Sequence, residues 1–203
     1  MSYTQSFEQA VSHAMLYEVG KFWNVNHVAV AGGLIDTPAN RKAVGYVNDP
    51  SDTGGETKFG VAVNANPDLN IKTLTWDAAK RVYFRKYWLA SNCDDITLIA
   101  PKLAAIHFDG AVNHGVGRAS KFLQQALGVV ADGDIGPATL NALSKMCADK
   151  SKEVELCRKV AELRKAFYNS IVRNNPTQAK FLNGWMTRIN EVEAFVVNTE
   201  IKN

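Results

Sequence analysis

A glutamate that follows an apolar helical stripe is the first candidate for acid chemistry in this sequence. Four apolar residues recur at the spacing of one helix face: Phe7, Val11, Ala14 and Met15. Glu18 stands eleven residues after Phe7, about three helical turns, so it falls on the same face. Poor solvation favours the neutral form of a carboxyl group, and such an acid can donate a proton near neutral pH. The alternative is a helix that simply ends in an exposed glutamate, as most glutamates are exposed.

A loop rich in glycine and aspartate, from Gly45 to Gly60, is the second candidate for chemistry. Its carboxylates Asp49 and Asp52 could stabilise positive charge or activate water beside an acid. Turn formation is the alternative for both residues, because Asp-Pro and aspartate close to Gly-Gly are common turn formers. The glycines permit positive φ angles or a close approach of the backbone to a ligand.

The segment from Tyr46 to Val61 resembles glycoside hydrolase family 108, phage and bacterial N-acetylmuramidases that cut peptidoglycan. The family pattern runs Glu-Gly-Gly-Tyr-x-Asn-Asp-Pro-x-Asp-x-Gly-Gly-x-Thr-x-Tyr/Phe-Gly-Ile/Val, and the match is almost residue for residue. The family's acid stands three residues before the tyrosine, whereas Glu18 stands 28 residues before Tyr46. We therefore interpret residues 19–44 as an insertion of about 25 residues between the acid and its loop. Glu56 is also available as an acid, but it occupies a variable position of the motif and no apolar stripe leads into it.

The resemblance implies hydrolysis of a glycosidic bond. In that reaction one acid protonates the leaving oxygen, and a second group stabilises the developing positive charge or activates water. Glu18 is then the acid and Asp52 the second carboxylate, while Asp49 is a structural turn residue. The resemblance of the arrangement to phage lysozymes implies that Thr57 orients a water through its hydroxyl.

A second segment, residues 107–115, resembles the helix-borne Phe-Asp-x-x-Val-Asn-x-Gly stretch that borders the sugar cleft in the same family. Asn113 and His114 near the helix end could hydrogen-bond an acetamido or hydroxyl group. Asp109 lies four residues before Asn113, on the same helix face. Together the two resemblances imply five substrate-contacting residues: Tyr46, Lys58, Asp109, Asn113 and His114.

A zinc-dependent wall amidase or peptidase is the alternative enzyme, because zinc uses residues such as His107, Asp109 and His114. These positions split across two faces of one helix, so a continuous helix cannot gather all three. We therefore expect no metal and no other cofactor, and we expect His107 to be a core histidine.

Residues 122–140 resemble the Leu-Gln-x-x-Leu-Gly-x-x-x-Asp-Gly-x-x-Gly-x-x-Thr unit of small helical peptidoglycan-binding modules. In physical terms this is a helix capped by Gly128, a tight turn at Asp132 and Gly133, and a helix from Pro137. Contact with the wall and a well-built helix-turn-helix corner are both open interpretations. The wall contact would also suit a peptidoglycan-binding protein without catalytic activity.

The whole pattern predicts a mainly α, lysozyme-like helical fold with a small β-hairpin element at residues 45–63. Helices are expected over residues 4–19, 76–88 (after an N-cap at Thr75), 102–113, 119–127, 137–148, 152–173 and 181–197. We divide the chain into a catalytic region, residues 1–115, with the insertion at about 19–44, and a helical peptidoglycan-binding-like region, residues 116–203. The second region is expected to pack on the first as one globular unit.

The composition of the chain restricts the kinds of partner that it can bind and the cellular compartment in which it folds. The 203 residues are 46% hydrophobic, enough for a substantial core, and the net charge of +3 is too mild for a nucleic-acid-binding signature. No stretch approaches the roughly 18 apolar residues of a membrane span, and the N-terminus lacks a signal-peptide pattern. The three cysteines have no zinc-ligand spacing, so reduced thiols are expected.

These features lead us to expect a monomer whose partner is peptidoglycan, with no nucleic acid and no stable membrane insertion. The family resemblance implies a phage endolysin that causes bacterial cell lysis. Such an enzyme is held in the host cytoplasm until a separate membrane-hole protein releases it to the wall.

Overall fold

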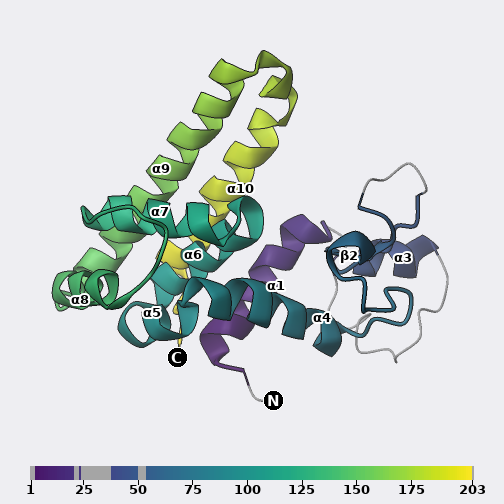
Figure 1. Cartoon of the computed structure of the whole chain (residues 1–203), viewed down its shortest axis with the longest axis horizontal. Helices are drawn as coiled ribbons and strands as arrows, with labels where there is room; N and C mark the ends of the chain where they lie inside the picture. The colour runs from purple at the N-terminus through teal and green to yellow at the C-terminus, as the bar shows by residue number, and fades with distance from the viewer. Residues whose placement is uncertain (1–2, 21–22, 24–37, 50–53, 203) are drawn as a thin grey trace. The chain divides into compact units, whose positions relative to one another are not determined.

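The computed structural model of the chain describes residues 3–20, 23, 38–49 and 54–202 (Figure 1). It divides into two compact units. The hairpin unit is Val11–Arg85, and the helical unit combines Met1–Ala10 with Lys86–Asn203. Helices dominate and the described strands form one two-stranded sheet, so the predicted mainly α, lysozyme-like fold with a small hairpin is confirmed.

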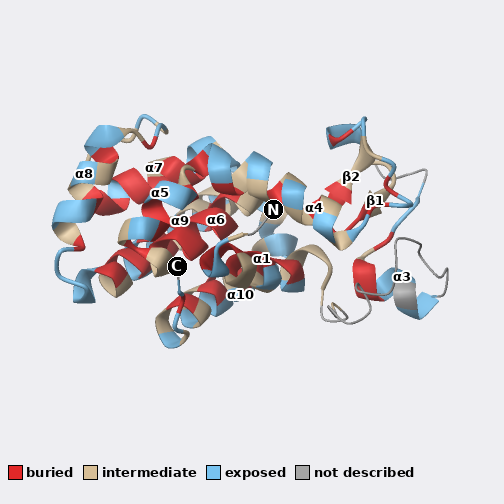
Figure 2. Ribbon diagram, turned by 90° about the horizontal axis from the view of Figure 1, so that it is seen from below, coloured by how far each residue is buried: buried red, intermediate tan, exposed pale blue. Residues whose placement is uncertain are grey.

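The helical unit is built around one buried helix. Besides the first residues of the N-terminal helix, this unit contains α5 (Cys93–Ile99), α6 (Pro101–His114), α7 (Val116–Leu127), α8 (Pro137–Met146), α9 (Ser151–Asn174) and α10 (Ala179–Asn198). Residues 103–111 of α6 are all buried, and its ribbon is largely red in Figure 2. This helix packs against α5, α7, α9 and α10, while α9 and α10 lie side by side as an antiparallel pair (Figure 1).

Local sequence signals account for several helix ends. The Thr75 side chain accepts a hydrogen bond from the Ala78 amide at 3.2 Å, which is the predicted N-cap of α4 (Trp76–Tyr83). Pro101 opens α6, and Gly128 ends α7 in the left-handed conformation with φ 73°. After Tyr83 the helix predicted through residue 88 continues as a π-helical turn, Phe84–Trp88.

The hairpin unit contains the end of α1 (Gln5–Glu18), α3 (Pro38–Val44), strands β1 (Thr57–Lys58) and β2 (Val61–Ala62), and α4. The strands pair antiparallel, with Thr57 opposite Ala62 and Lys58 opposite Val61. Phe59 and Gly60 join them with φ angles of 54° and 72°. Two positive φ angles are the condition for the type I′ turn of a two-residue hairpin.

The compact units divide the chain after residues 10 and 85, whereas the motifs of the sequence predicted a division after residue 115. Residue 115 lies between α6 and α7, which pack on one another inside the helical unit. The separation of the chain at residue 115 into a catalytic region and a peptidoglycan-binding-like region stays a prediction. Within the described residues, no helix combines the length and apolar character needed to cross a bilayer.

Candidate active site

Glu18 packs against the turn between the two strands. A Cβ atom added to Gly60 would lie 3.0 Å from the Cβ of Glu18 and 3.4 Å from its Oε2, and it would overlap the hydroxyl of Tyr83. Position 60 therefore requires glycine for two reasons: its φ is positive, and the space beside it is too small for any side chain. The half-buried carboxyl group of Glu18 thus reaches the backbone of the motif loop.

The two ends of the predicted insertion meet within the hairpin unit. A Cβ atom on Gly45 would lie 3.4 Å from the Cα of Val19 and 3.3 Å from its Cγ1. Glu18 directly precedes Val19, and Gly45 directly precedes Tyr46. The chain therefore leaves at Val19 and returns beside it at Gly45, which keeps the acid next to the loop despite their separation in sequence.

Two hydrogen bonds hold the turn that packs against Glu18. The buried Tyr83 hydroxyl donates to the Phe59 carbonyl at 2.9 Å, and the Phe59 amide donates to the Val44 carbonyl at 2.8 Å. Positive φ at a bulky residue costs about 1–3 kcal/mol and persists only where its surroundings impose it. No local sequence pattern indicated that Tyr83 holds this turn, because its hydrogen-bond partner Phe59 lies 24 residues away along the chain.

Of the other two predicted catalytic residues, the structure describes Thr57 but not Asp52. Thr57 is the first residue of β1, and its backbone exchanges two hydrogen bonds with that of Val47. Its hydroxyl donates to the Gly55 carbonyl at 3.1 Å. Its oxygen keeps acceptor capacity for a water, so the water-orienting role stays a prediction. Asp52 lies outside the described residues, and Asp49 is exposed.

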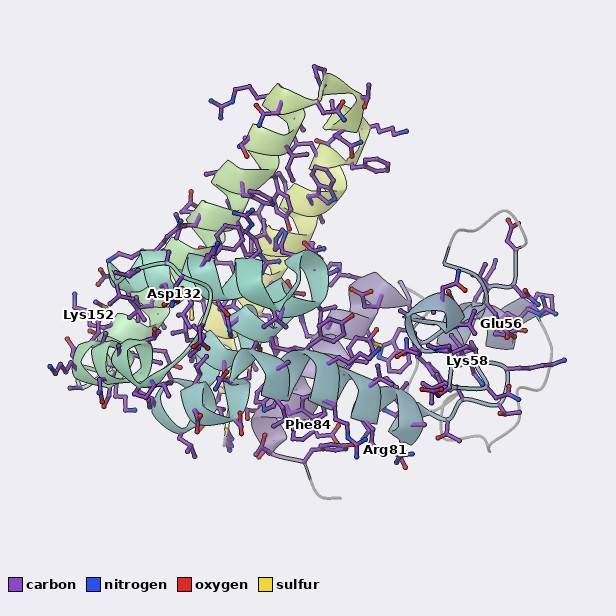
Figure 3. The ribbon with its side chains drawn as sticks, viewed as in Figure 1. Glu56, Lys58, Arg81, Phe84, Asp132 and Lys152 are labelled. Atoms are coloured by element: carbon purple, nitrogen blue, oxygen red, sulfur yellow. The ribbon has the colours of Figure 1, made fainter. Side chains whose placement is uncertain are left out.

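Tyr46 and Lys58 brace the loop from within. The Tyr46 hydroxyl donates to Glu56 Oε1 at 2.6 Å, and the Arg41 guanidinium lies 5.4 Å from the centre of the Tyr46 ring. Lys58 is 5% exposed and its ammonium donates to the Lys72 carbonyl at 3.2 Å. Burial lowers the pKa of Lys58, opposed by the charge of Glu56, which lies with it in the hairpin unit (Figure 3). Contact of Tyr46 and Lys58 with substrate stays a prediction.

In the helical unit, the buried Asp109 links three helices: it lies in α6 and forms ion pairs with arginines of α9 and α10. Arg164 of α9 donates to one carboxylate oxygen at 2.6 Å, and Arg188 of α10 donates twice to the other, at 3.0 and 2.8 Å. Burial raises the pKa of Asp109, but the charges of the two guanidinium groups outweigh it and hold the pKa at about 2. This geometry gives Asp109 a structural role, and its predicted contact with substrate is untested.

Asn113 and His114 join the same network at the end of α6. The Tyr168 hydroxyl donates to Asn113 Oδ1 at 2.7 Å, and Arg164 Nε donates to His114 Nε2 at 3.3 Å. Burial, followed by the charge of Arg164, lowers the pKa of His114 to about 3. Both side chains are only half-buried, so binding of an acetamido or hydroxyl group by either one stays a prediction.

The residues of the zinc alternative already have protein partners. His107 is 1% exposed, as expected of a core histidine, and its Nε2 lies 3.0 Å from the Ser91 carbonyl. Asp109 is held by two arginines, and His114 Nε2 accepts from Arg164. Across the described part of the chain, no three histidine, cysteine or acidic side chains gather as a metal site.

A side-chain network explains the spacing of the third motif. Gln124 is 1% exposed and its amide donates to Asp132 Oδ1 at 2.6 Å and to the Asp134 carbonyl at 2.9 Å. Its oxygen accepts from the Gly133 amide at 2.8 Å, and Gly133 has φ 94°. The turn that contains Asp132 (labelled in Figure 3) is therefore locked onto α7, which is the helix-turn-helix corner of the sequence analysis.

Two regions of the chain match known protein families. Residues 41–115 match the family described as glycosyl hydrolase 108, and residues 118–190 match the family described as a predicted peptidoglycan domain. The protein is a glycoside hydrolase with a family 108 region and a C-terminal peptidoglycan domain. This hydrolase is similar to the solved structure of Brucella abortus SagA, with 28% sequence identity, a TM-score of 0.60 and coverage of 75% of this chain and 86% of that chain. A comparison with curated proteins found no match.

The family 108 match begins at residue 41, so it does not include Glu18. The position of Glu18 in the hydrolase therefore rests on its packing against Gly60 and on the contact of Val19 with Gly45. Peptidoglycan is the partner that the C-terminal match indicates.

A groove of about 860 Å³ opens within this peptidoglycan domain, between the ends of α7 and α8 and one side of α9. Apolar side chains line part of it, including Leu127, Met146 and Leu163. Charged side chains of both signs line the rest: Glu155, Arg158, Lys159 and Glu162. Apolar lining with a few charged groups is typical of ligand sites.

Proposed function

We propose that this hydrolase is an N-acetylmuramidase that cleaves the β-1,4 bond between N-acetylmuramic acid and N-acetylglucosamine. The observation that carries the proposal is the packing of the Glu18 carboxyl group against Gly60 of the family 108 loop. Glu18 is half-buried and lies beside a turn that hydrogen bonds hold in place, so its side chain has a defined position from which it can donate a proton.

Glu18 protonates the glycosidic oxygen as its bond to the sugar breaks, and positive charge develops on the ring that is left behind. Asp52 is our proposed second carboxylate, which stabilises that charge or activates the attacking water. Thr57 is proposed to hold this water with the acceptor capacity of its hydroxyl oxygen. The turn at Phe59 and Gly60 keeps the acid in place through its bond to Tyr83.

The peptidoglycan domain is proposed to hold the enzyme on the wall through the groove beside α9. Arg158 would meet carboxylates of the wall's peptides, whereas Lys159, Glu155 and Glu162 already form ion pairs within α9. An Arg158→Glu variant should therefore co-sediment less with purified peptidoglycan. Arg173→Glu, near the end of the same helix and away from the groove residues, is the matched control, and equal loss in both variants would count against the groove.

The biological role that we propose is that of a phage-type endolysin. It would stay in the host cytoplasm as a monomer until a membrane-hole protein releases it, and it would then cause bacterial lysis. The buried, unpaired thiols of Cys93, Cys147 and Cys157 are compatible with folding in a reducing compartment. Lysis from within after co-expression with a membrane-hole protein, and its absence without that protein, would support this role.

Product analysis tests the bond specificity. Purified peptidoglycan is digested, the new reducing ends are reduced with borohydride, and the resulting sugar alcohols are identified by mass spectrometry. A muramidase leaves N-acetylmuramic acid at the new reducing end. New N-acetylglucosamine ends would contradict the proposal. Release of peptides without new reducing ends, abolished by a chelator and restored by zinc, would favour the amidase or peptidase alternative.

A further inference from the structure

Three aromatic rings gather within the hairpin unit. The ring centroids of Trp23 and Trp76 are 4.9 Å apart with planes inclined by 63°, and Phe59 lies 5.7 Å from Trp76 and 6.2 Å from Trp23. Phe59 is only 2% exposed, whereas both tryptophans are half-buried. The buried ring therefore supports two indoles that keep part of their surface in solvent.

The cluster adjoins the acid through the backbone of the turn. Phe59 is bonded to Gly60, against which Glu18 packs, and the Phe59 carbonyl accepts from Tyr83 of α4. Trp76 is the first residue of that same helix. Phe59, whose ring contacts both indoles, and Gly60, which packs against Glu18, are therefore adjacent residues of one turn.

The inserted segment supplies one of the two half-buried indoles. Trp23 belongs to residues 19–44, and its amide donates to the Gly20 carbonyl at 2.9 Å. Gly20 has φ 94°, a backbone conformation that favours glycine, and the Trp23 ring lies against Phe59 of the hairpin unit. The segment that separates Glu18 from the motif loop in sequence thus adds a ring beside Phe59 of that loop.

We propose that Trp23 and Trp76 form a saccharide-binding platform that takes one sugar ring of the glycan strand next to the cleaved bond. This proposal rests on the proposed function of the hydrolase. Sugar rings have apolar C–H faces, and a tryptophan offers a large rigid apolar surface together with an N–H that can bond a hydroxyl. Two rotatable bonds per indole keep the entropy cost of binding low.

The test measures binding of peptide-free glycan strands, prepared from peptidoglycan by removing the stem peptides. Calorimetry on proteins that carry Glu18→Gln gives the dissociation constant without hydrolysis. We expect Trp23→Leu and Trp76→Leu to weaken binding about threefold to tenfold, the range of a lost aromatic contact. Trp23→Phe keeps an aromatic face and should retain most of the affinity.

Trp185→Leu is the matched control. Trp185 is also half-buried and stacks on Tyr168 at 5.3 Å, but it belongs to the helical unit. In the active protein, Trp23→Leu should raise KM for the glycan strands by a similar factor with little change in kcat, because it removes binding shared by ground and transition states. Trp185→Leu should change neither value.

Unchanged affinity in a folded Trp23→Leu protein, or equal losses in the leucine and phenylalanine variants at position 23, would overturn the platform. The ring cluster would then be a small core. Failure of the proposed function is distinguishable, because in that case the wild-type protein itself would release no muramic acid ends from peptidoglycan.

Discussion

At the scale of single residues, the division of work between carboxylates is the main question. Glu18 is the acid that the packing around Gly60 supports, and Glu56 already accepts a hydrogen bond from Tyr46. Asp52 is the partner that the family pattern implies, whereas Asp49 is assigned to the turn. The two aspartates can be separated experimentally, because aspartate and asparagine have similar shape and turn-forming ability but differ in charge.

We predict that Asp52→Asn loses several kcal/mol of transition-state stabilisation, since it removes a charge positioned for the reaction. Asp49→Asn should keep most turnover and lose about 1 kcal/mol of stability, as expected for a weakened turn contact. Thr57→Ala should fall between them, because another water can partly replace the hydroxyl. Turnover and melting temperature of all three, on the same peptidoglycan, provide the comparison. An inactive Asp49→Asn beside an active Asp52→Asn would reverse the assignment.

At the scale of elements, the hairpin turn packs against Glu18, the proposed acid. Phe59 and Gly60 both have positive φ, and contacts with Val44 and Tyr83 hold them there. The hairpin therefore depends on α3 and α4 for its shape, and a change that displaces the turn should move the backbone next to Glu18.

We predict that Gly60→Ala loses most wall hydrolysis, because the added methyl would overlap the Tyr83 hydroxyl and press on Glu18. Gly128→Ala is a close control. Its φ of 73° matches the 72° of Gly60, and no atom lies within 4 Å of the added Cβ. Both variants should lose about 1 kcal/mol from backbone strain alone. Equal activity in the two variants, measured on one wall preparation, would show that the contact with Glu18 is unimportant.

The sequence predicted the elements better than the contacts between them. The Thr75 cap, Pro101 and Gly128 are local signals, and the helices that they bound were found near their observed ends. Helix α5 was missed because it is short and Asn92, in the left-handed conformation, supplies no side-chain cap. The turn-holding bond of Tyr83 spans 24 residues, and no local pattern reports it.

The role of Asp109 was hidden for the same reason. Its partners Arg164 and Arg188 lie 55 and 79 residues away, so the local motif indicated substrate contact, which stays a prediction, and could not indicate these ion pairs. The packing of Val19 against Gly45 was equally invisible, although the predicted apolar stripe is buried and Glu18, the last residue of the same helix, is half-buried.

At the scale of the whole molecule, buried ionisable groups set the response to acid. Burial lowers the pKa of His107 to about 4 and that of His114 to about 3, against 6.5 for an exposed histidine. Between those values and pH 6.5 the unfolded chain binds protons that the folded chain does not, so stability falls as pH falls. Asp109, with its pKa held at about 2, adds stability above pH 4 that is lost as pH falls through 2.

We predict that the free energy of unfolding falls below pH 6.5 by at most about 1.4 kcal/mol per pH unit for the buried His107, and by less for the partly exposed His114. Denaturant titrations from pH 7 to pH 4 measure this slope. His107→Gln should flatten it, whereas His13→Gln serves as a control for the loss of a histidine in the hairpin unit. A profile of His107→Gln that coincides with the wild type would refute the assignment.

The most direct test of the central claim compares Glu18→Gln and Glu56→Gln with the wild type. Reducing-end release from purified peptidoglycan and melting temperature are measured for each protein. We predict that Glu18→Gln folds normally and loses hydrolysis by at least the ~10²-fold typical of a missing general acid. Glu56→Gln should keep most of its turnover and show a modest loss of stability from its weakened bond to Tyr46. Near-wild-type hydrolysis by a folded Glu18→Gln, above all beside an inactive Glu56→Gln, would contradict the assignment of Glu18 as the acid.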